Sequence, residues 1–238
     1  MRLKPTMPTV LPNRVGLKAW LLGLLLASAG CTREIEQTAF YNNQTPQAAP
    51  TIKSGCVGNP QKAQTINAAV LVQGGTGKYI LLPATPPAPA EIQFETLEGI
   101  ANSRTRLTWA EDQNYSSVNQ RGAFTMYKVD SVSPYLTFLK TATAAPLKAE
   151  PVWLVTQEIE NGNHKLCRVT ITKSSNLRLT YRYWDTPEPG IKRGYPLVNH
   201  NGELVGMHTE ETSDEKGTYG KGVPLAAINQ AITANESR

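Results

Sequence analysis

Hydrophobic positions along the chain fall into short runs that glycine, proline and asparagine separate, and this pattern continues from Cys56 almost to the C-terminus. Runs of about four to eight residues that are apolar or alternating, bounded by turn-forming residues, are typical of β-strands. The clearest runs are Ile66–Val72, Tyr79–Leu82, Phe124–Val129, Tyr135–Leu139, Val152–Val155, Leu166–Ile171, Leu177–Trp184 and Leu204–Met207. Because no helical pattern separates them, these runs predict an all-β sandwich or barrel.

The run Leu177–Trp184 alternates throughout, so its side chains divide between the two faces of a strand. Leucines and tyrosines form one face, and Arg178, Thr180, Arg182 and Trp184 form the other. The basic and aromatic face either binds phosphate or a glycan, or is the solvated outside of a barrel strand.

The two ends of the chain differ from this middle part. Pro224–Ala234 has apolar residues three or four apart, which predicts a C-terminal helix. Near the N-terminus, Ala19–Gly30 is an apolar run of twelve residues, too short for a membrane span of about 20. A basic region before it and small residues at its end indicate a secretory signal. The polar, proline-bearing stretch from Cys31 to residue 55 predicts a flexible tether.

The residues Ala27–Cys31 resemble a bacterial lipobox, in which the cysteine is lipidated and becomes the new N-terminus. The resemblance implies a lipid anchor on Cys31. It also implies an outer-membrane location, facing the periplasm or the cell surface, because Thr32 rather than an aspartate follows the cysteine. A plain signal that leaves Cys31 as a thiol is the alternative, and translation from Met7 would shorten the basic region.

Net charge argues against a nucleic-acid partner. The chain carries +5, but four of its basic residues precede the apolar run: Arg2, Lys4, Arg14 and Lys18. Cleavage of the signal would leave +1, too little for the overall electrostatic footprint of a nucleic-acid-binding protein.

Two cysteines remain once Cys31 is lipidated. An even pair in an oxidising compartment predicts a disulfide between Cys56 and Cys167, worth up to about 4–5 kcal/mol, and two buried thiols are the alternative. The three histidines lack the spacing of metal ligands, so no metal and no cofactor is expected. Gly74–Lys78 is not a phosphate-binding loop, because Tyr79 follows the lysine, and we expect a turn between strands there.

Three stretches together resemble the trypsin-like serine proteases of the chymotrypsin fold. Gly190–Met207 is similar to the family's nucleophile motif with the strand, turn and strand that follow it, and Asn-Gly between apolar runs is itself a strong hairpin signal. Gly75–Pro83 resembles the strand pair before the family's catalytic histidine. Tyr135–Lys140, with Pro151–Val155, resembles the connection between its two barrels.

This resemblance implies two six-stranded antiparallel barrels, at about residues 56–145 and 146–238, with a short C-terminal helix. The chain then divides into a lipoprotein signal peptide at 1–30, the tether at 31–55 and a trypsin-like domain at 56–238.

Proteolysis by this family requires a serine, a histidine and an aspartate, and none occupies its matching position. Alignment through Gly194 places Arg193 at the nucleophile and Lys192 at the acid before it, whereas alignment through Pro189 places Lys192 at the nucleophile. Neither side chain can attack as a serine does, since arginine in particular is always protonated. Tyr195 also replaces a glycine that lets the backbone approach closely, which argues against a working oxyanion hole.

The other two triad positions also lack their catalytic residues. The histidine position falls near Thr85, and no histidine precedes His164. The aspartate position falls at Ser133 or Pro134, with Asp130 a few residues too early.

The resulting hypothesis is a pseudoprotease: a membrane-anchored envelope lipoprotein that binds a peptide or protein without catalysis. The residues expected to line the former active-site cleft are Thr85, Arg193, Tyr195 and His208. Arg193 suits a carboxylate partner, and His208 either favours an acidic side chain or has no special role. Two alternatives stay open, an active envelope serine protease with a rearranged catalytic set and a structural lipoprotein of a secretion or conjugation apparatus.

Overall fold

The computed structural model describes residues 47–60, 68–83, 91–98, 101–108, 114–117, 124–129, 133–184, 191–215 and 217–237. The predicted signal peptide, the lipidation site Cys31 and the cleft residue Thr85 lie outside these ranges. The described ranges all belong to one compact unit that begins at Thr45.

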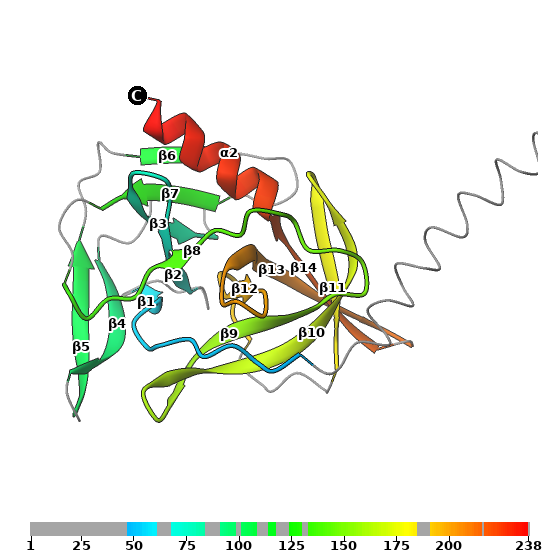
Figure 1. The fold of residues 1–238 in the computed structure, drawn as a ribbon, viewed down its shortest axis with the longest axis horizontal. Helices are drawn as coiled ribbons and strands as arrows, with labels where there is room; N and C mark the ends of the chain where they lie inside the picture. Colours follow the sequence, from blue (N-terminus) through cyan, green and yellow to red (C-terminus); the bar gives the residue numbers. More distant parts are fainter. Residues whose placement is uncertain are drawn as a thin grey trace, which may run out of the picture. The chain divides into compact units, whose positions relative to one another are not determined.

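The N-terminal half of this unit is an eight-stranded sheet (Figure 1). Seven strands follow the order β5-β4-β1-β2-β3-β7-β6 with antiparallel neighbours, and the short β8 pairs with β2 in parallel. Their bounds are β1 Val57–Pro60, β2 Ala69–Gln73, β3 Lys78–Leu82, β4 Glu91–Glu98, β5 Ala101–Thr108, β6 Asn114–Ser117, β7 Phe124–Lys128 and β8 Leu139–Lys140. Six strands were expected in this half, and the described residues form eight.

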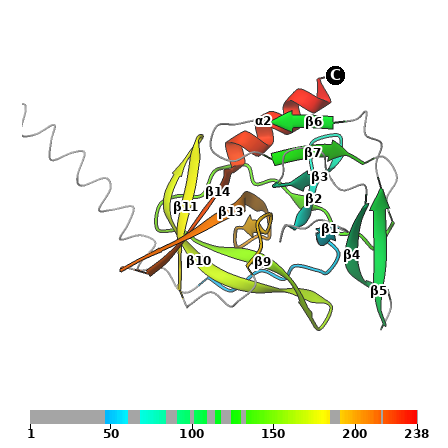
Figure 2. The same ribbon diagram turned by 180° about the vertical axis from the view of Figure 1, so that it is seen from behind.

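The C-terminal half is a closed antiparallel barrel of six strands, in the order β10-β11-β14-β13-β12-β9 (Figures 1 and 2). The bounds are β9 Pro151–Glu160, β10 Asn163–Ser175, β11 Arg178–Tyr183, β12 Pro196–Val198, β13 Leu204–Asp214 and β14 Gly217–Pro224. One cluster of buried side chains includes residues of both halves, and a smaller cluster lies within the N-terminal sheet. The all-β prediction is therefore confirmed.

The Asn-Gly hairpin is confirmed in detail. Strands β12 and β13 pair around a turn in which Asn199 Oδ1 accepts hydrogen bonds from the backbone N–H groups of Asn201 and Glu203, both at 3.0 Å. Gly202 has a φ of +77°, which suits its place in the turn.

The predicted strand Tyr135–Leu139 is wrong for most of its length. The segment turns at Pro134 and Tyr135, and only Leu139 enters a strand. Thr137 instead binds the segment that precedes β1. Its N–H donates to Gly55 O at 3.2 Å, and its hydroxyl donates to Ser54 O at 2.9 Å. These bonds to residues far away in the sequence replace the pairing that a strand would need.

The predicted disulfide does not form. Cys56 lies just before β1, fully buried, and burial raises the pKa of its thiol. Cys167 lies in β10 on the same side as the inward-facing Val169 and Ile171. The structure has no disulfide between Cys56 and Cys167, and counting cysteines by compartment could not show this.

The C-terminal helix α2, Leu225–Glu236, joins the two halves (Figure 2). Its apolar side is buried, and its last glutamate reaches the loop between β2 and β3. There the Glu236 carboxylate accepts the N–H groups of Thr76 at 2.7 Å and Gly77 at 3.3 Å. The glycine-rich loop is thus the expected turn, and it holds a carboxylate of the protein itself. In the part of the chain that the structure describes, no helix has the length and hydrophobicity to cross a membrane.

Candidate binding site

The loop that carries Arg193 enters the barrel through Gly194, whose φ is +98°. The backbone passes so close to the N-terminal sheet that a Cβ on Gly194 would overlap the carbonyl oxygen of Ala68. Ala68 N–H donates to Arg193 O at 2.6 Å, and Gly194 N–H donates to His208 O at 2.8 Å. The positive φ and the close approach both require glycine, so this loop has a fixed backbone between the two halves.

The Arg193 side chain is exposed, although its backbone is fixed. It is close enough to His208 for its charge to help lower the pKa of that imidazole. A guanidinium on a rigid loop can form two parallel hydrogen bonds to a carboxylate with little loss of backbone entropy. Of the predicted cleft residues that the structure describes, only Arg193 is exposed.

Lys192 connects the two halves. Its Nζ donates to Asn59 Oδ1 on β1 at 3.2 Å and to Gln157 Oε1 on β9 at 2.9 Å. Both acceptors are side-chain amide oxygens, and the two bonds hold the loop against both sheets. Sequence reasoning placed Lys192 beside or at the nucleophile position but did not foresee this bridge, since Asn59 is 133 residues away.

Tyr195 is buried, with 3% of its surface exposed. Burial raises the pKa of its phenol, and a hydrogen bond from the Gln157 backbone partly offsets that effect. Its carbonyl oxygen accepts the His208 N–H at 2.8 Å. Tyr195 therefore anchors the loop to the barrel wall, where the protease family has a small glycine.

His208 lies inside the barrel, with 2% of its surface exposed. Its Nδ1 forms a hydrogen bond with the hydroxyl of Tyr181 on β11, and the Tyr183 ring packs edge-on against Tyr181 at 5.6 Å. Burial and, to a smaller extent, the Arg193 charge lower the pKa of His208 to about 4, against the opposing effect of Glu210. The imidazole is consequently neutral near pH 7.

The structure thus brings three of the four predicted cleft residues together, but their side chains differ in exposure to solvent. Backbone hydrogen bonds connect Arg193–Tyr195 to His208, but only Arg193 presents its side chain to solvent. The bond between Tyr181 and His208 was missed from the sequence. The inward-facing tyrosines of the alternating strand were visible there, but their partner was not.

The other histidines have structural surroundings. His164 is buried, its Nε2 accepts the Cys56 N–H at 3.4 Å, and burial lowers its pKa to about 4. His200 is exposed in the β12–β13 turn. Across the described ranges, no serine hydroxyl is hydrogen-bonded to a histidine, and no group of three or more potential metal ligands is found.

Comparison with known proteins finds similarity only at the level of structure. No protein-family model and no curated protein matches the chain. A mutant of human heparin binding protein (CAP37) is similar with a TM-score of 0.54 at 10% identity, over 80% of this chain and 97% of that one. The serine endoprotease from Yersinia pestis gives a TM-score of 0.49 at 20% identity, over 82% of this chain. The match covers 66% of that protease, slightly under two thirds of its length.

The MamO protease domain from Magnetospirillum magneticum gives a TM-score of 0.47 at 16% identity, over 74% of this chain and 95% of that one. At such identities the likeness concerns the fold, and the match to the human protein carries it. The chain therefore has the chymotrypsin-like fold of the trypsin-like serine proteases, as its sequence motifs predicted.

Proposed function

We propose that the chain is an outer-membrane lipoprotein, lipidated at Cys31, whose trypsin-like domain binds a peptide or protein of the cell envelope without cleaving it. The observation that carries the proposal is the Arg193 loop. Its backbone is fixed by hydrogen bonds to Ala68 and His208, while the guanidinium stands in solvent. A preorganised cation of this kind favours recognition of a carboxylate, either an acidic side chain or a chain terminus.

The chemistry of the same loop supports binding rather than catalysis. The position that aligns with the family's nucleophile holds Arg193, and the position of the preceding acid holds Lys192. An arginine cannot serve as a nucleophile, and Lys192 is engaged by two amide oxygens. The buried neutral His208 is hydrogen-bonded to the Tyr181 hydroxyl, and in the described residues no serine hydroxyl is bonded to it.

The three described cleft residues take different roles in this proposal. Arg193 contacts the partner. Tyr195 and His208 position the loop, since their backbone groups bond to each other and to Gly194 and neither side chain is open to solvent.

Site-specific crosslinking in cells tests the proposal. A photo-crosslinking amino acid replaces Ile191, a half-buried residue two positions before Arg193, so that the guanidinium stays in place. The same replacement at Lys148, an exposed lysine in the connection before β9, is the matched control. We expect a discrete adduct with one envelope protein from position 191 and none from position 148. Added wild-type chain is expected to compete for the adduct. Loss of that competition with Arg193→Ala, but not with Arg193→Lys, would establish the role of the charge.

Equal adducts from both positions, or none from position 191, would contradict partner binding at this loop. Membrane fractionation of the full chain tests the anchor separately. Cys31→Ser is expected to release the protein into the soluble envelope fraction, and unchanged membrane association would overturn the lipidation.

A further inference from the structure

The outside of the barrel carries a group of cations that the Arg193 loop does not include. In the register of the sheet, Thr180 of β11 lies opposite Lys173 on β10 and Lys221 on β14, so these side chains point to the same side. Arg178 and Arg182 of β11 share that side, as does Trp184, which directly follows the strand. We call this surface the basic face, formed by Arg168, Lys173, Arg178, Arg182, Trp184 and Lys221.

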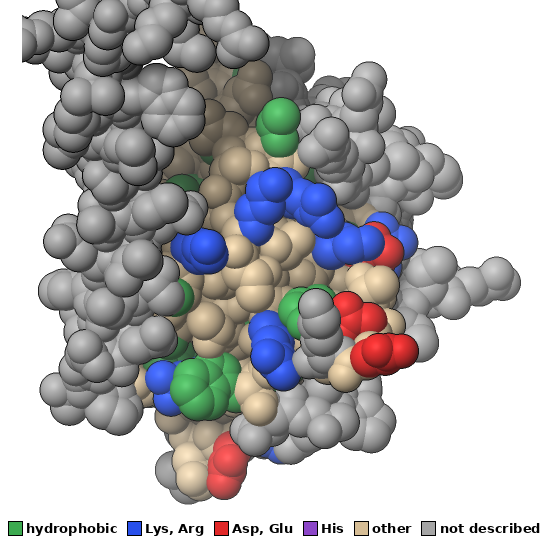
Figure 3. Space-filling view, turned by 90° about the vertical axis from the view of Figure 1, so that its right-hand side faces the viewer, with side chains coloured by type: hydrophobic (Ala, Val, Ile, Leu, Met, Phe, Trp, Pro, Cys, Tyr) green, Lys and Arg blue, Asp and Glu red, His purple; other side chains and the backbone are tan. Residues whose placement is uncertain are grey.

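The basic face is elongated. From Arg178 to Trp184 the strand rises by about 20 Å, and outward side chains recur every second residue. Lys and Arg side chains lie around an uncharged area on the surface in Figure 3, while Asp and Glu gather mainly toward one side. Positive charges spread over this length suit an extended anionic chain better than a single small anion.

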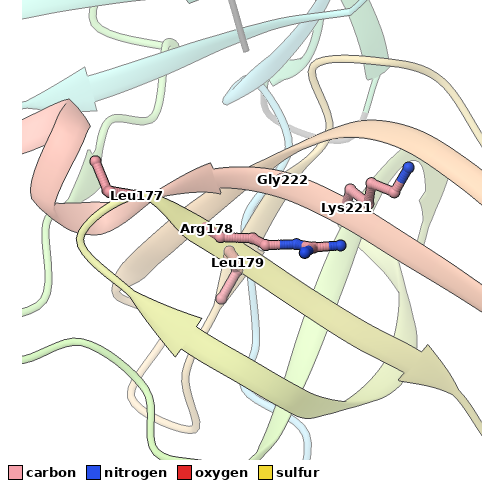
Figure 4. A pocket seen from close by; sticks show the side chains of 5 residues that line it. All are labelled: Leu177, Arg178, Leu179, Lys221 and Gly222. Atoms are coloured by element: carbon pink, nitrogen blue, oxygen red, sulfur yellow. The ribbon is translucent and has the colours of Figure 1, made fainter. Parts of the chain in front are cut away.

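A hollow of about 340 Å³ opens at one end of the basic face, lined by Leu177, Arg178, Leu179, Lys221 and Gly222 (Figure 4). Gly222 lies opposite the inward-facing Leu179, so the hollow meets its backbone, and a Cβ there would point into the barrel and press on the Met207 carbonyl at 2.6 Å. The side chains of Arg178 and Lys221 extend to the same side in Figure 4. The volume lies within the range of small-ligand sites, so it is large enough for one sugar unit with an anionic substituent.

The charges at the hollow are available to a ligand. Among the described residues, Arg178 has no side-chain ion pair or hydrogen bond. Lys221 pairs with Glu210 at 3.0 Å, with more than a third of each side chain exposed. An exposed pair of this kind contributes about 0–1 kcal/mol, so an incoming anion can replace Glu210 at small cost.

The other end of the basic face holds an aromatic platform. The side chain of Trp184 is 60% exposed, and its indole N–H donates to the hydroxyl of Thr170. The Arg168 guanidinium lies 4.3 Å from the ring centroid. These two contacts hold the indole in place, and its exposed part is available for a flat apolar face of a ligand to stack on.

We propose that the basic face binds an anionic polysaccharide. A sugar bearing a sulfate, phosphate or carboxylate group enters the hollow between Arg178 and Lys221, and a further sugar of the same chain stacks on Trp184. Single-stranded nucleic acid binds through bases stacked on successive aromatics, whereas this face has one exposed tryptophan. A flat bilayer surface would stop at the long cationic side chains and not reach the recessed Gly222. This site is separate from the Arg193 loop and does not depend on its role.

Binding of the full chain to dextran sulfate, compared with neutral dextran, tests the proposal. The main variant is Arg178→Ala with Lys221→Ala. Its matched control is Lys140→Ala with Lys148→Ala, which removes the same charge from exposed lysines outside β10, β11 and β14. We expect dextran sulfate to bind, neutral dextran not to bind, the main variant to lose at least fivefold in affinity and the control to stay within twofold.

Trp184→Ala separates stacking from charge. It is expected to weaken dextran sulfate binding two- to fivefold while the dependence of affinity on salt stays as in the wild type, because no cation is removed. Thermal unfolding of each variant confirms that the fold is intact. Equal affinity of the main variant and its control would overturn the proposal. A single-stranded oligonucleotide or anionic phosphatidylglycerol vesicles that bind as tightly, and lose as much in the main variant, would also overturn it in favour of nucleic acid or lipid.

Discussion

The side chains on the two faces of β11 have opposite surroundings. Inside the barrel, Tyr181 is fully buried and its hydroxyl is bonded to His208, so its polar group is satisfied within the protein. Outside, Arg178 and Trp184 are exposed, and the Arg178 charge has no ion-pair partner in the described residues. Stability should therefore depend on the inner face and recognition on the outer face, since burial stabilises a fold and unpartnered charge does not.

The largest expected effect comes from emptying the inner face. Tyr181→Ala removes a fully buried ring that packs against Tyr183, and it also removes the hydrogen bond to His208. Truncations of this size in a core cost about 3–5 kcal/mol of unfolding free energy. Urea unfolding followed by tryptophan fluorescence measures the loss. A loss below about 1 kcal/mol would show that the barrel interior does not depend on this ring.

The next effect is a dependence of stability on pH. The folded pKa values of His164 and His208 are both about 4, below the ordinary 6.5. Between these values the unfolded chain binds more protons than the folded one, so the stability is full above pH 6.5 and is lost as the pH falls toward 4. Each ring contributes up to about 3 kcal/mol to that loss.

Urea unfolding at intervals from pH 7 to pH 4 checks this dependence. Carboxylates titrate near the lower end, so the comparison is made with His208→Gln, which is expected to show a shallower decline between pH 6.5 and 5 than the wild type. Identical slopes for the two proteins would contradict the assignment of a neutral, buried His208.

A smaller effect on stability is expected at Glu236, whose carboxylate accepts hydrogen bonds from backbone N–H groups. The N–H groups of Thr76 and Gly77 lower the pKa of Glu236, and its charge together with burial raises the pKa of Tyr79 to about 12. Glu236→Gln keeps the shape but removes the charge, and should lower the unfolding free energy by about 0.5–1 kcal/mol at this exposed position. Glu215→Gln, at an exposed hairpin position, is the control and should change it by less.

The smallest effect belongs to the outer face. Arg178→Ala removes an exposed side chain without an ion pair among the described residues, so the unfolding free energy should change by less than about 0.5 kcal/mol. The same substitution is expected to weaken anionic polysaccharide binding. A loss of stability as large as that of Tyr181→Ala would remove the distinction between the two faces.

Local sequence patterns predicted the features that local physics determines. Alternation in Leu177–Trp184 separated the buried Leu179, Tyr181 and Tyr183 from the exposed arginines and Trp184, because side chains in a strand alternate strictly. The Asn199–Gly202 turn and the C-terminal helix followed from residue preferences within a few positions.

Features that depend on long-range pairing could not be predicted in this way. The Lys192–Asn59 bridge, the contact of Glu236 with Thr76 and the separation of the two cysteines depend on how the sheets are arranged. The same holds for the failed strand Tyr135–Leu139, whose backbone bonds to Ser54 and Gly55 instead of pairing locally. A single sequence contains the residues but not the register that brings them together.

Reaction of the purified full chain with a fluorophosphonate probe, read by intact mass, tests most directly whether this trypsin-like fold acts without a catalytic serine. Active trypsin treated in parallel confirms that the probe is reactive. We expect no adduct on the chain, because Arg193 occupies the nucleophile position and the described histidines have no serine partner. A single adduct on a native serine would contradict the account and identify the nucleophile of an active protease.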